Sequence, residues 1–182
     1  MAYKRTYKLH QSRAEQRGPC FALIPHTPLI APVRVAKFSW PDEIKKWNHL
    51  SDIRYSLAVG TEEQRIEALN ADADIYIINR ENIQWLVEKS GVPFDFDMLV
   101  IDELSSFKNH QTKRFKSLMK VRPKVKRIVG LTGTPSSNGL MDLFAEFKIL
   151  DMGERLGRFI GQYRNKYFNP TALLDLLNRA FL

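Results

Sequence analysis

Several features that define common protein classes are scarce in this sequence. Its 182 residues include a single cysteine, Cys20, which excludes an internal disulfide framework and a cysteine-rich zinc site and fits a reducing cytosol. No apolar run approaches the length of a membrane span. No continuous apolar stretch follows the basic amino terminus, as it would in a secretory signal. The sequence therefore predicts a cytoplasmic protein without a membrane partner.

Signatures of a histidine metal site and of a catalytic triad are also missing. The four histidines are too scattered for a metal site, and surface or helix-capping roles are the default for His10, His26, His49 and His110. No serine lies in a nucleophile elbow, so a catalytic triad has no support. The chain contains neither internal repeats nor low-complexity tracts.

Acidic residues are missing from one long segment. Residues 104–141 contain nine lysines and arginines and no aspartate or glutamate, within a chain whose net charge is +8. Such a concentration of one sign favours a polyanionic partner, most simply a nucleic-acid backbone. A solvated surface that keeps the protein soluble explains the same charges.

What is present indicates one α/β domain. Hydrophobic residues make up 44% and aromatic residues 11% of the chain, enough for a core. Apolar runs alternate with amphipathic segments, which predicts a largely parallel sheet with helices between its strands. The predicted strands cover residues 29–33, 55–60, 74–78, 98–101 and 127–131, with a short additional strand at 21–24 that is broken by prolines at 25 and 28.

The central feature is the strand at residues 98–101, which runs directly into Asp102 and Glu103. Its unbroken apolar character predicts burial on both faces. Acidic residues at the carboxyl end of a strand lie where open α/β sheets place their chemistry. Strand ends are also commonly acidic because turns are solvated.

The segments that follow and precede this strand carry a resemblance to a known family. Asp102 and Glu103 with Lys108 and Asn109 resemble the extended DEAH-box region of Swi/Snf-type ATPases in helicase superfamily two. Residues 131–135, Leu-Thr-Gly-Thr-Pro, with Asn138 resemble the third motif of that family. Residues 29–32, Leu-Ile-Ala-Pro, followed by Trp40, Glu43 and Trp47, are similar to its motif Ia. The resemblance extends from 29 to 168 and is nearest to the compact versions of bacteriophages.

This resemblance implies a fold, a reaction and roles for particular residues. It implies the first RecA-like domain of an ATP-dependent DNA helicase or translocase, with helices on both faces of the sheet. Asp102 would hold Mg²⁺ through water, and Glu103 would activate the attacking water. Thr132, Gly133 and Thr134 would couple the nucleotide state to DNA contact. A phage-encoded protein of this kind would act in the bacterial host cell.

The implied partner is double-stranded or branched DNA. In the family, motif Ia approaches the DNA backbone, which makes Arg34 and Lys37 candidates for contact. The basic segment adds four further candidates, Lys108, Lys113, Arg114 and Lys116. Residues 79–82 occupy the position of motif Ib, although plain helix capping by Asn79 explains them equally well.

One expected element of the family is not found. A phosphate-binding loop, with glycines that cradle the phosphates and a Gly-Lys-Ser/Thr sequence, should precede motif Ia, yet no Gly-Lys-Ser/Thr occurs in the chain. We therefore expect a sheet that is incomplete at the amino terminus and a polypeptide that is nearly inactive alone. A separate chain carrying the loop and the second RecA-like domain would be an additional partner.

Helical periodicity predicts which residues are buried. Trp40, Ile44 and Trp47 share one face, and as core residues they need no base-stacking role. A capping box is expected at Thr61. Three later helices are predicted, each with its own buried stripe. The stripes are Ile83, Leu86 and Val87 in the first; Phe115, Leu118 and Met119 in the second, at 110–121; and Leu140, Leu143, Phe144 and Phe147 in the third. In the helix at 110–121, Lys113, Arg114, Lys116 and Lys120 are expected to point outward.

The predicted organisation is a basic lead-in at residues 1–19, a RecA-like domain at 20–152 and an extension at 153–182 that includes a leucine-rich helix from 171. Arginines and aromatic rings alternate at 153–168, which suits either a nucleic-acid strand or packing against the domain. Two other functions are open. One is a non-catalytic module that binds DNA or a partner, and the other is a metal-dependent nuclease using Asp95, Asp97 and Asp102.

Overall fold

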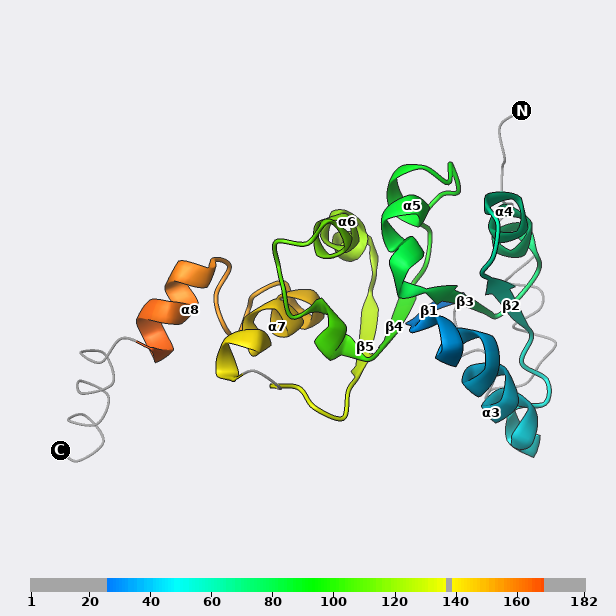
Figure 1. Ribbon diagram of the computed structural model, residues 1–182, viewed down its shortest axis with the longest axis horizontal. Helices are drawn as coiled ribbons and strands as arrows, with labels where there is room; N and C mark the ends of the chain where they lie inside the picture. Colours follow the sequence, from blue (N-terminus) through cyan, green and yellow to red (C-terminus); the bar gives the residue numbers. More distant parts are fainter. Residues whose placement is uncertain (1–25, 137–138, 169–182) are drawn as a thin grey trace.

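The computed structural model describes residues 26–136 and 139–168, and it contains one five-stranded sheet (Figure 1). All pairings are parallel, in the order β2-β3-β1-β4-β5. The strands are β1 (Thr27–Ala31), β2 (Tyr55–Ala58), β3 (Ile75–Asn79), β4 (Met98–Asp102) and β5 (Arg127–Leu131). The predicted strand at 21–24, the lead-in at 1–19, Asn138 and the helix from 171 lie outside the described residues.

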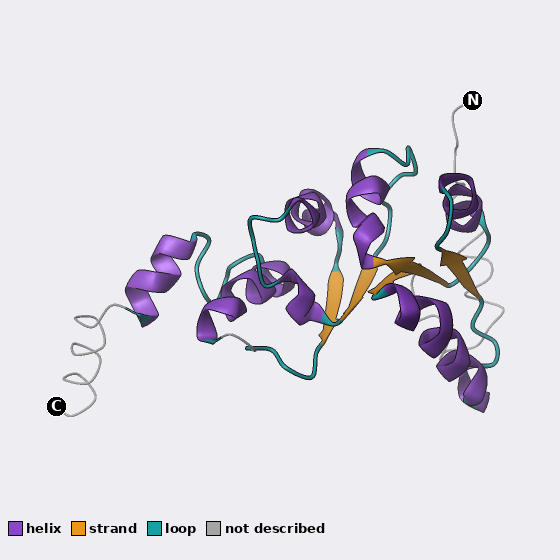
Figure 2. Ribbon diagram, viewed as in Figure 1, coloured by secondary structure: helices purple, strands orange, loops and turns teal. Residues whose placement is uncertain are grey.

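Helices cover both faces of the sheet, which confirms the predicted α/β class (Figure 2). They are α3 (Trp40–Lys46), α4 (Glu62–Asn70), α5 (Ile83–Glu88), α6 (Lys113–Val121), α7 (Leu143–Asp151) and α8 (Ile160–Tyr167). Helices α4, α5, α6 and α7 contribute to the core on one face, whereas α3 packs on the other. None of the helices in the described ranges is both long and apolar enough to cross a membrane.

Strand β1 begins earlier than predicted because Pro28 does not interrupt it. The Thr27 N–H donates to the Asp74 carbonyl on the β3 side, at 3.0 Å. Backbone N–H groups alternate in direction along a strand, so the nitrogen of Pro28 faces the β4 side. Pairing with β4 starts only at Leu29, and the missing proline N–H therefore costs no ladder hydrogen bond.

Burial falls across the sheet from β3 to β5. On the α3 face, one row of neighbours runs through Ile77, Leu29, Val100 and Val129. Ile77 and Leu29 are buried, whereas Val100 and Val129 are half-buried. The prediction that residues 98–101 are buried on both faces is therefore wrong. The cluster that α3 covers includes Leu29 of β1 and Ile77 of β3 and has Val100 of β4 at its partly buried margin, and among the described residues no β5 residue belongs to it.

The opposite face is more evenly packed. Its row comprises Ile78, Ile30, Ile101 and Gly130, and all three isoleucines are fully buried. A Cβ atom on Gly130 would lie 2.5 Å from a methyl carbon of Leu104, so the glycine is needed for Leu104 to pack beneath α7.

Local signals place several helix boundaries. The predicted capping box at Thr61 is confirmed, because its hydroxyl accepts from the Gln64 N–H while the Gln64 side chain accepts from the Thr61 N–H. Helix α6 begins at Lys113 rather than at residue 110, since the Thr112 hydroxyl caps it by accepting from the Phe115 N–H. Asn79 does not cap a helix backbone; its side chain bonds the side chains of Glu81 and Asn82.

Two predicted core stripes need correction. Trp40 packs against the cluster on the α3 face, but Trp47 follows the end of α3 and is 48% exposed, with its indole N–H donating to Glu43. In the last predicted stripe, Leu140 is 59% exposed because it lies in a 3₁₀ turn before α7. The residues of α7 that are buried are Phe144, Ala145, Glu146 and Ile149.

Candidate functional site

The carboxyl ends of the strands bring four connecting segments to one edge of the sheet. Residues 32–39 follow β1, residues 80–82 follow β3, Glu103 follows β4, and residues 132–136 follow β5. Because all strands are parallel, segments far apart in the sequence meet at this edge. The predicted acid pair and the predicted threonine-glycine-threonine turn are therefore neighbours.

Asp102 is the last residue of β4 and is partly exposed. Its Oδ2 atom accepts a hydrogen bond from the indole Nε1–H of Trp40, at 2.9 Å. Trp40 comes from the segment after β1, 62 residues earlier in the chain. The carboxylate of Asp102 is thus oriented by a neutral donor from a neighbouring connection, a contact that the sequence did not indicate.

Glu103 adopts a backbone conformation that is rare for residues with a side chain. Its φ of 56° and ψ of 61° lie in the left-handed region, where a Cβ atom is strained by about 1–2 kcal/mol. Its Oε1 atom accepts from the hydroxyls of Ser105 and Thr132, the latter at 3.3 Å. This contact joins the end of β4 to the end of β5. It brings together two segments that were predicted to act together.

The rest of the predicted turn is open to solvent. Gly133 and Thr134 are exposed, and the Thr134 N–H donates to the Thr132 hydroxyl at 3.3 Å. The structure thus brings Thr132 to the acid pair through its side chain. Gly133 and Thr134 follow it in sequence, and among the described residues neither is hydrogen-bonded to Asp102 or Glu103.

A third carboxyl group near this pair was missed by the sequence analysis. Glu146 of α7 is only 2% exposed, and its Oε1 atom has no hydrogen-bond partner among the described residues. Burial, followed by the nearby charges of Asp142 and Glu103, raises the pKa of Glu146 to about 7, while Lys108 acts in the opposite direction. The available signal was helical position: Glu146 lies three residues before Ile149, on the buried face of α7.

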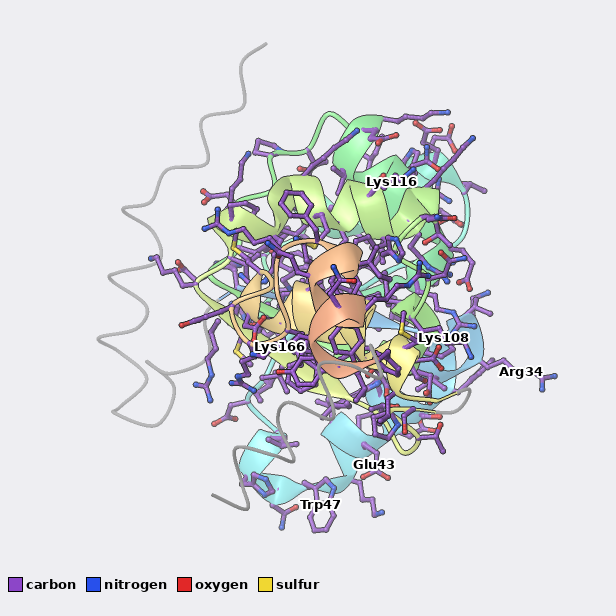
Figure 3. The ribbon with its side chains drawn as sticks, turned by 90° about the vertical axis from the view of Figure 1, so that its left-hand side faces the viewer. Arg34, Glu43, Trp47, Lys108, Lys116 and Lys166 are labelled. Carbon is purple, nitrogen blue, oxygen red and sulfur yellow. The ribbon has the colours of Figure 1, made fainter. Side chains whose placement is uncertain are left out.

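The predicted DNA-contacting residues fall into separate groups. Arg34 and Lys37 are exposed on the segment after β1, and Lys113 and Lys116 are exposed on α6. Lys108 lies 3.8 Å from Asp142 in an ion pair. In Figure 3, Lys116 lies well apart from both Arg34 and Lys108. The six predicted residues therefore do not form one continuous patch.

Arg114 does not point outward as expected. Its guanidinium donates to the Ser106 carbonyl at 2.8 Å and lies over the Phe107 ring at 5.0 Å. Burial, and then the nearby charge of Arg80, lowers its pKa from the usual arginine value. Arg114 therefore supports the turn after Glu103, which makes its removal a structural change as well as a change of charge.

The arrangement argues against the nuclease alternative. Asp95 and Asp97 precede β4, whereas Asp102 ends it, so about 16 Å of extended strand separates the two ends. Asp97 instead pairs with Lys126 at 2.6 Å. Within residues 26–136 and 139–168, no three histidine, cysteine, aspartate or glutamate side chains gather as they do around a protein-bound metal.

The segment at 153–168 uses its rings in two ways. Tyr163 is buried, stacks on Phe144 with ring centroids 5.8 Å apart, and donates its hydroxyl to the Leu140 carbonyl at 2.7 Å. Phe159 is 68% exposed. Packing thus explains Tyr163, and it does not explain Phe159.

Comparisons with known proteins agree with this geometry. Residues 6–169 match the family described as SNF2-related domain. The chain is 40% identical over 153 residues to protein p41 of Acyrthosiphon pisum secondary endosymbiont phage 1, covering 81% of this chain and 33% of that protein. It is 28% identical over 151 residues to the DNA excision repair protein ERCC-6-like of Danio rerio, covering 80% of this chain and 10% of that protein.

A solved structure supports the same conclusion. The SWI2/SNF2 ATPase core of Sulfolobus solfataricus in complex with dsDNA superimposes with a TM-score of 0.66 at 26% identity, covering 91% of this chain and 33% of that one. The predicted RecA-like fold and the resemblance to Swi/Snf-type proteins, including a phage relative, are therefore confirmed. The chain spans a third or less of the proteins that it matches.

Proposed function

Because this chain belongs to the SNF2-related domain family, we propose that it forms the acid-bearing, DNA-contacting part of an ATP-driven translocase of Swi/Snf type. The observation that supports this most strongly is the contact between Glu103 and Thr132. It joins the two segments whose sequences resemble the DEAH-box region and the third motif of such motors. A shared edge for these two segments is what coupling between hydrolysis and DNA contact requires.

The residues present fit a magnesium ion. Mg²⁺ favours carboxylate oxygens and keeps several waters, so one partly exposed aspartate at an open edge is a suitable protein ligand. Asp102 would hold the ion through water, and the ion would neutralise charge on transferred phosphate. Glu103 would accept a proton from the attacking water. The hydroxyls of Ser105 and Thr132 donate to its carboxylate and hold the carboxylate in position.

The residues present do not fit a complete nucleotide site. Phosphates are held by glycine-rich backbone and by the lysine of a Gly-Lys-Ser/Thr sequence, which this chain does not contain. We therefore infer that ATP turnover depends on a further polypeptide segment carrying the phosphate loop and the second RecA-like domain. Without even one arginine that such a partner supplies to the transition state, the rate of hydrolysis falls by roughly 10³ to 10⁵.

DNA contact is assigned to the exposed cations at the carboxyl edge. Arg34 and Lys37 are exposed on the segment that follows β1. Lys113 and Lys116 form a second, separate group of exposed cations on α6. Phosphate contacts of this kind supply affinity without reading sequence. The similar ATPase core of Sulfolobus solfataricus was solved with dsDNA, which supports double-stranded DNA as the ligand.

A second candidate is a non-catalytic module that binds DNA and has no part in ATP turnover. The absence of a Gly-Lys-Ser/Thr sequence favours it. Both candidates predict DNA binding, and they differ in whether hydrolysis appears when the missing segments are supplied on another chain. Restoration of DNA-stimulated turnover by such a chain would support the translocase.

The DNA role is tested by fluorescence anisotropy with a labelled duplex. Four phosphate contacts predict a loss of affinity on the order of 100-fold between 50 and 200 mM salt. Reversing both charges in Arg34→Glu/Lys37→Glu should weaken binding and lower the salt slope by about two. The matched control is Lys89→Glu/Lys124→Glu, which changes the same charge at two exposed lysines away from this edge. An affinity that does not change with salt, or that falls equally in both double variants, would contradict the proposal.

A further inference from the structure

The hydrogen bond between Trp40 and Asp102 joins two parts of the candidate site that differ in their proposed tasks. Asp102 is the proposed magnesium ligand, and Trp40 ends the segment that carries Arg34 and Lys37. The bond is partly buried, 2.9 Å long and made to one oxygen, Oδ2. A hydrogen bond to a charged acceptor in a partly dry site is stronger than one in water.

The backbone before Trp40 fixes where its ring lies. Residues 35–39 form a wide π-helical turn, closed by the Trp40 backbone N–H donating to the Val35 carbonyl five residues earlier. Such turns are rare and frequently occur at functional sites. The indole then packs against the cluster that includes Ala31, Ala36 and Ile44. A movement of the exposed segment would therefore be transmitted to the ring.

Another tryptophan provides a built-in comparison. Trp47 makes a chemically identical bond, from its indole N–H to Glu43 at 2.9 Å, but this bond is exposed and spans only four residues. It links neighbours on one helix end and reaches no other strand. The partly buried position of the Trp40 bond, and its span across two strand ends, are thus not general features of tryptophan in this protein.

We propose that Trp40 is a positioning residue that holds the Asp102 carboxylate and couples it to the segment at 32–39. The coupling rests on the proposed function, because it requires that segment to contact DNA. Binding of DNA to Arg34 and Lys37 changes the hydrogen bond at Asp102, and the orientation of the magnesium ligand follows the state of the DNA surface. Trp40 takes no part in bond making or breaking.

The test uses the full chain labelled with ¹⁵N, in which the three tryptophans give three indole N–H resonances. Trp→Phe variants assign them. Asp102→Ala should shift the Trp40 resonance and accelerate its hydrogen exchange at least 10-fold, while Glu43→Ala should do the same to Trp47 alone. If the alanine variant does not fold, Asp102→Asn replaces it. Because asparagine keeps an acceptor oxygen, the shift and the exchange of the Trp40 resonance should change less. A Trp40 resonance that does not respond at Asp102 would overturn the proposal.

The coupling is tested by adding duplex DNA at low salt, with anisotropy run on the same sample. We expect the Trp40 resonance to move in the unaltered chain and to stay in place in Arg34→Glu/Lys37→Glu, whereas Trp85 stays in place in both. DNA that binds without moving Trp40 would overturn the inference and leave the proposed function standing. DNA that fails to bind would overturn the proposed function and the coupling together, and the Asp102→Ala result would still decide whether the bond exists.

Discussion

The two halves of the sheet are buried to different degrees. Strand β1 is buried at all five positions and β3 at its three central ones, whereas β4 is buried at only two and β5 at none. Helix α3 covers the second face of β1 and β3. On that face only Val100 of β4 reaches the cluster under α3; no described residue of β5 does, and β5 pairs with β4 alone. Stability should therefore come mainly from one half of the sheet.

The residues with chemical roles lie along the boundary between the halves. Asp102, Glu103 and Thr132 extend from the thinly covered strands, while Trp40 reaches them from the covered half. This placement separates what holds the domain together from what it would do. Substitutions on the two sides should consequently affect stability by different amounts.

The largest difference is expected along the row on the α3 face. Ile77→Ala removes a fully buried side chain from β3 and should lower the free energy of unfolding by about 2–5 kcal/mol. Val129→Ala, in the same row on half-buried β5, should cost about 1 kcal/mol or less. Urea denaturation of both variants gives the two values. Equal losses would mean that β5 is as well covered as β3.

A difference in pH dependence is expected for two glutamates. The pKa of Glu146 is raised to about 7, so its neutral form stabilises the fold fully below pH 4.5, and this contribution is lost as pH rises through 7. Glu146→Gln should remove that loss and be more stable than the unaltered chain at pH 8 by about 1–3 kcal/mol. Denaturation at pH 5 and pH 8 measures the effect, and a gap between the two proteins that is the same at both pH values would contradict it.

Glu88 provides the opposite control. Hydrogen bonds from Lys120, Gln84 and Ser117 lower its pKa to about 2. Its contribution is present above pH 4.5 and disappears as pH falls toward 2. Glu88→Gln should therefore lower the free energy of unfolding near neutral pH, and the difference from the unaltered chain should disappear as the pH falls toward 2.

The smallest effect concerns the strained backbone at Glu103. Glu103→Gly and Glu103→Ala both remove the carboxylate, but only glycine adopts a φ of 56° without strain. The glycine variant should be more stable than the alanine variant by about 1 kcal/mol. Thermal unfolding compares them directly. An alanine variant of equal or higher stability would show that the backbone there is relaxed.

Much of the fold could be predicted from the sequence because the strands carry strong local signals. Apolar runs located all five described strands, and the capping box located the start of α4. The acid pair and residues 132–134 were linked in the sequence only by their resemblance to family motifs, and the parallel strands place both at one edge of the sheet. Boundaries that depend on tertiary context, such as Pro28 within β1, were wrong because the sequence does not show which side a backbone N–H faces.

The missed site features depend on side-chain packing between distant segments. The bond from Trp40 to Asp102 spans 62 residues, and nothing near either residue indicates it. Arg114 was grouped with the surface cations by its spacing, although its guanidinium lies over Phe107. Glu146 was overlooked because a single acid on an apolar helix face resembles an ordinary surface residue until the helix is docked.

We propose that this chain carries the DNA surface and the acid pair of a Swi/Snf-type motor and does not turn over ATP alone. The most direct measurement is phosphate release by the isolated chain, with Mg²⁺ and ATP, at a duplex concentration that saturates the anisotropy signal. We predict release no faster than that of Glu103→Gln measured in parallel. DNA-stimulated release that Glu103→Gln abolishes would contradict the account.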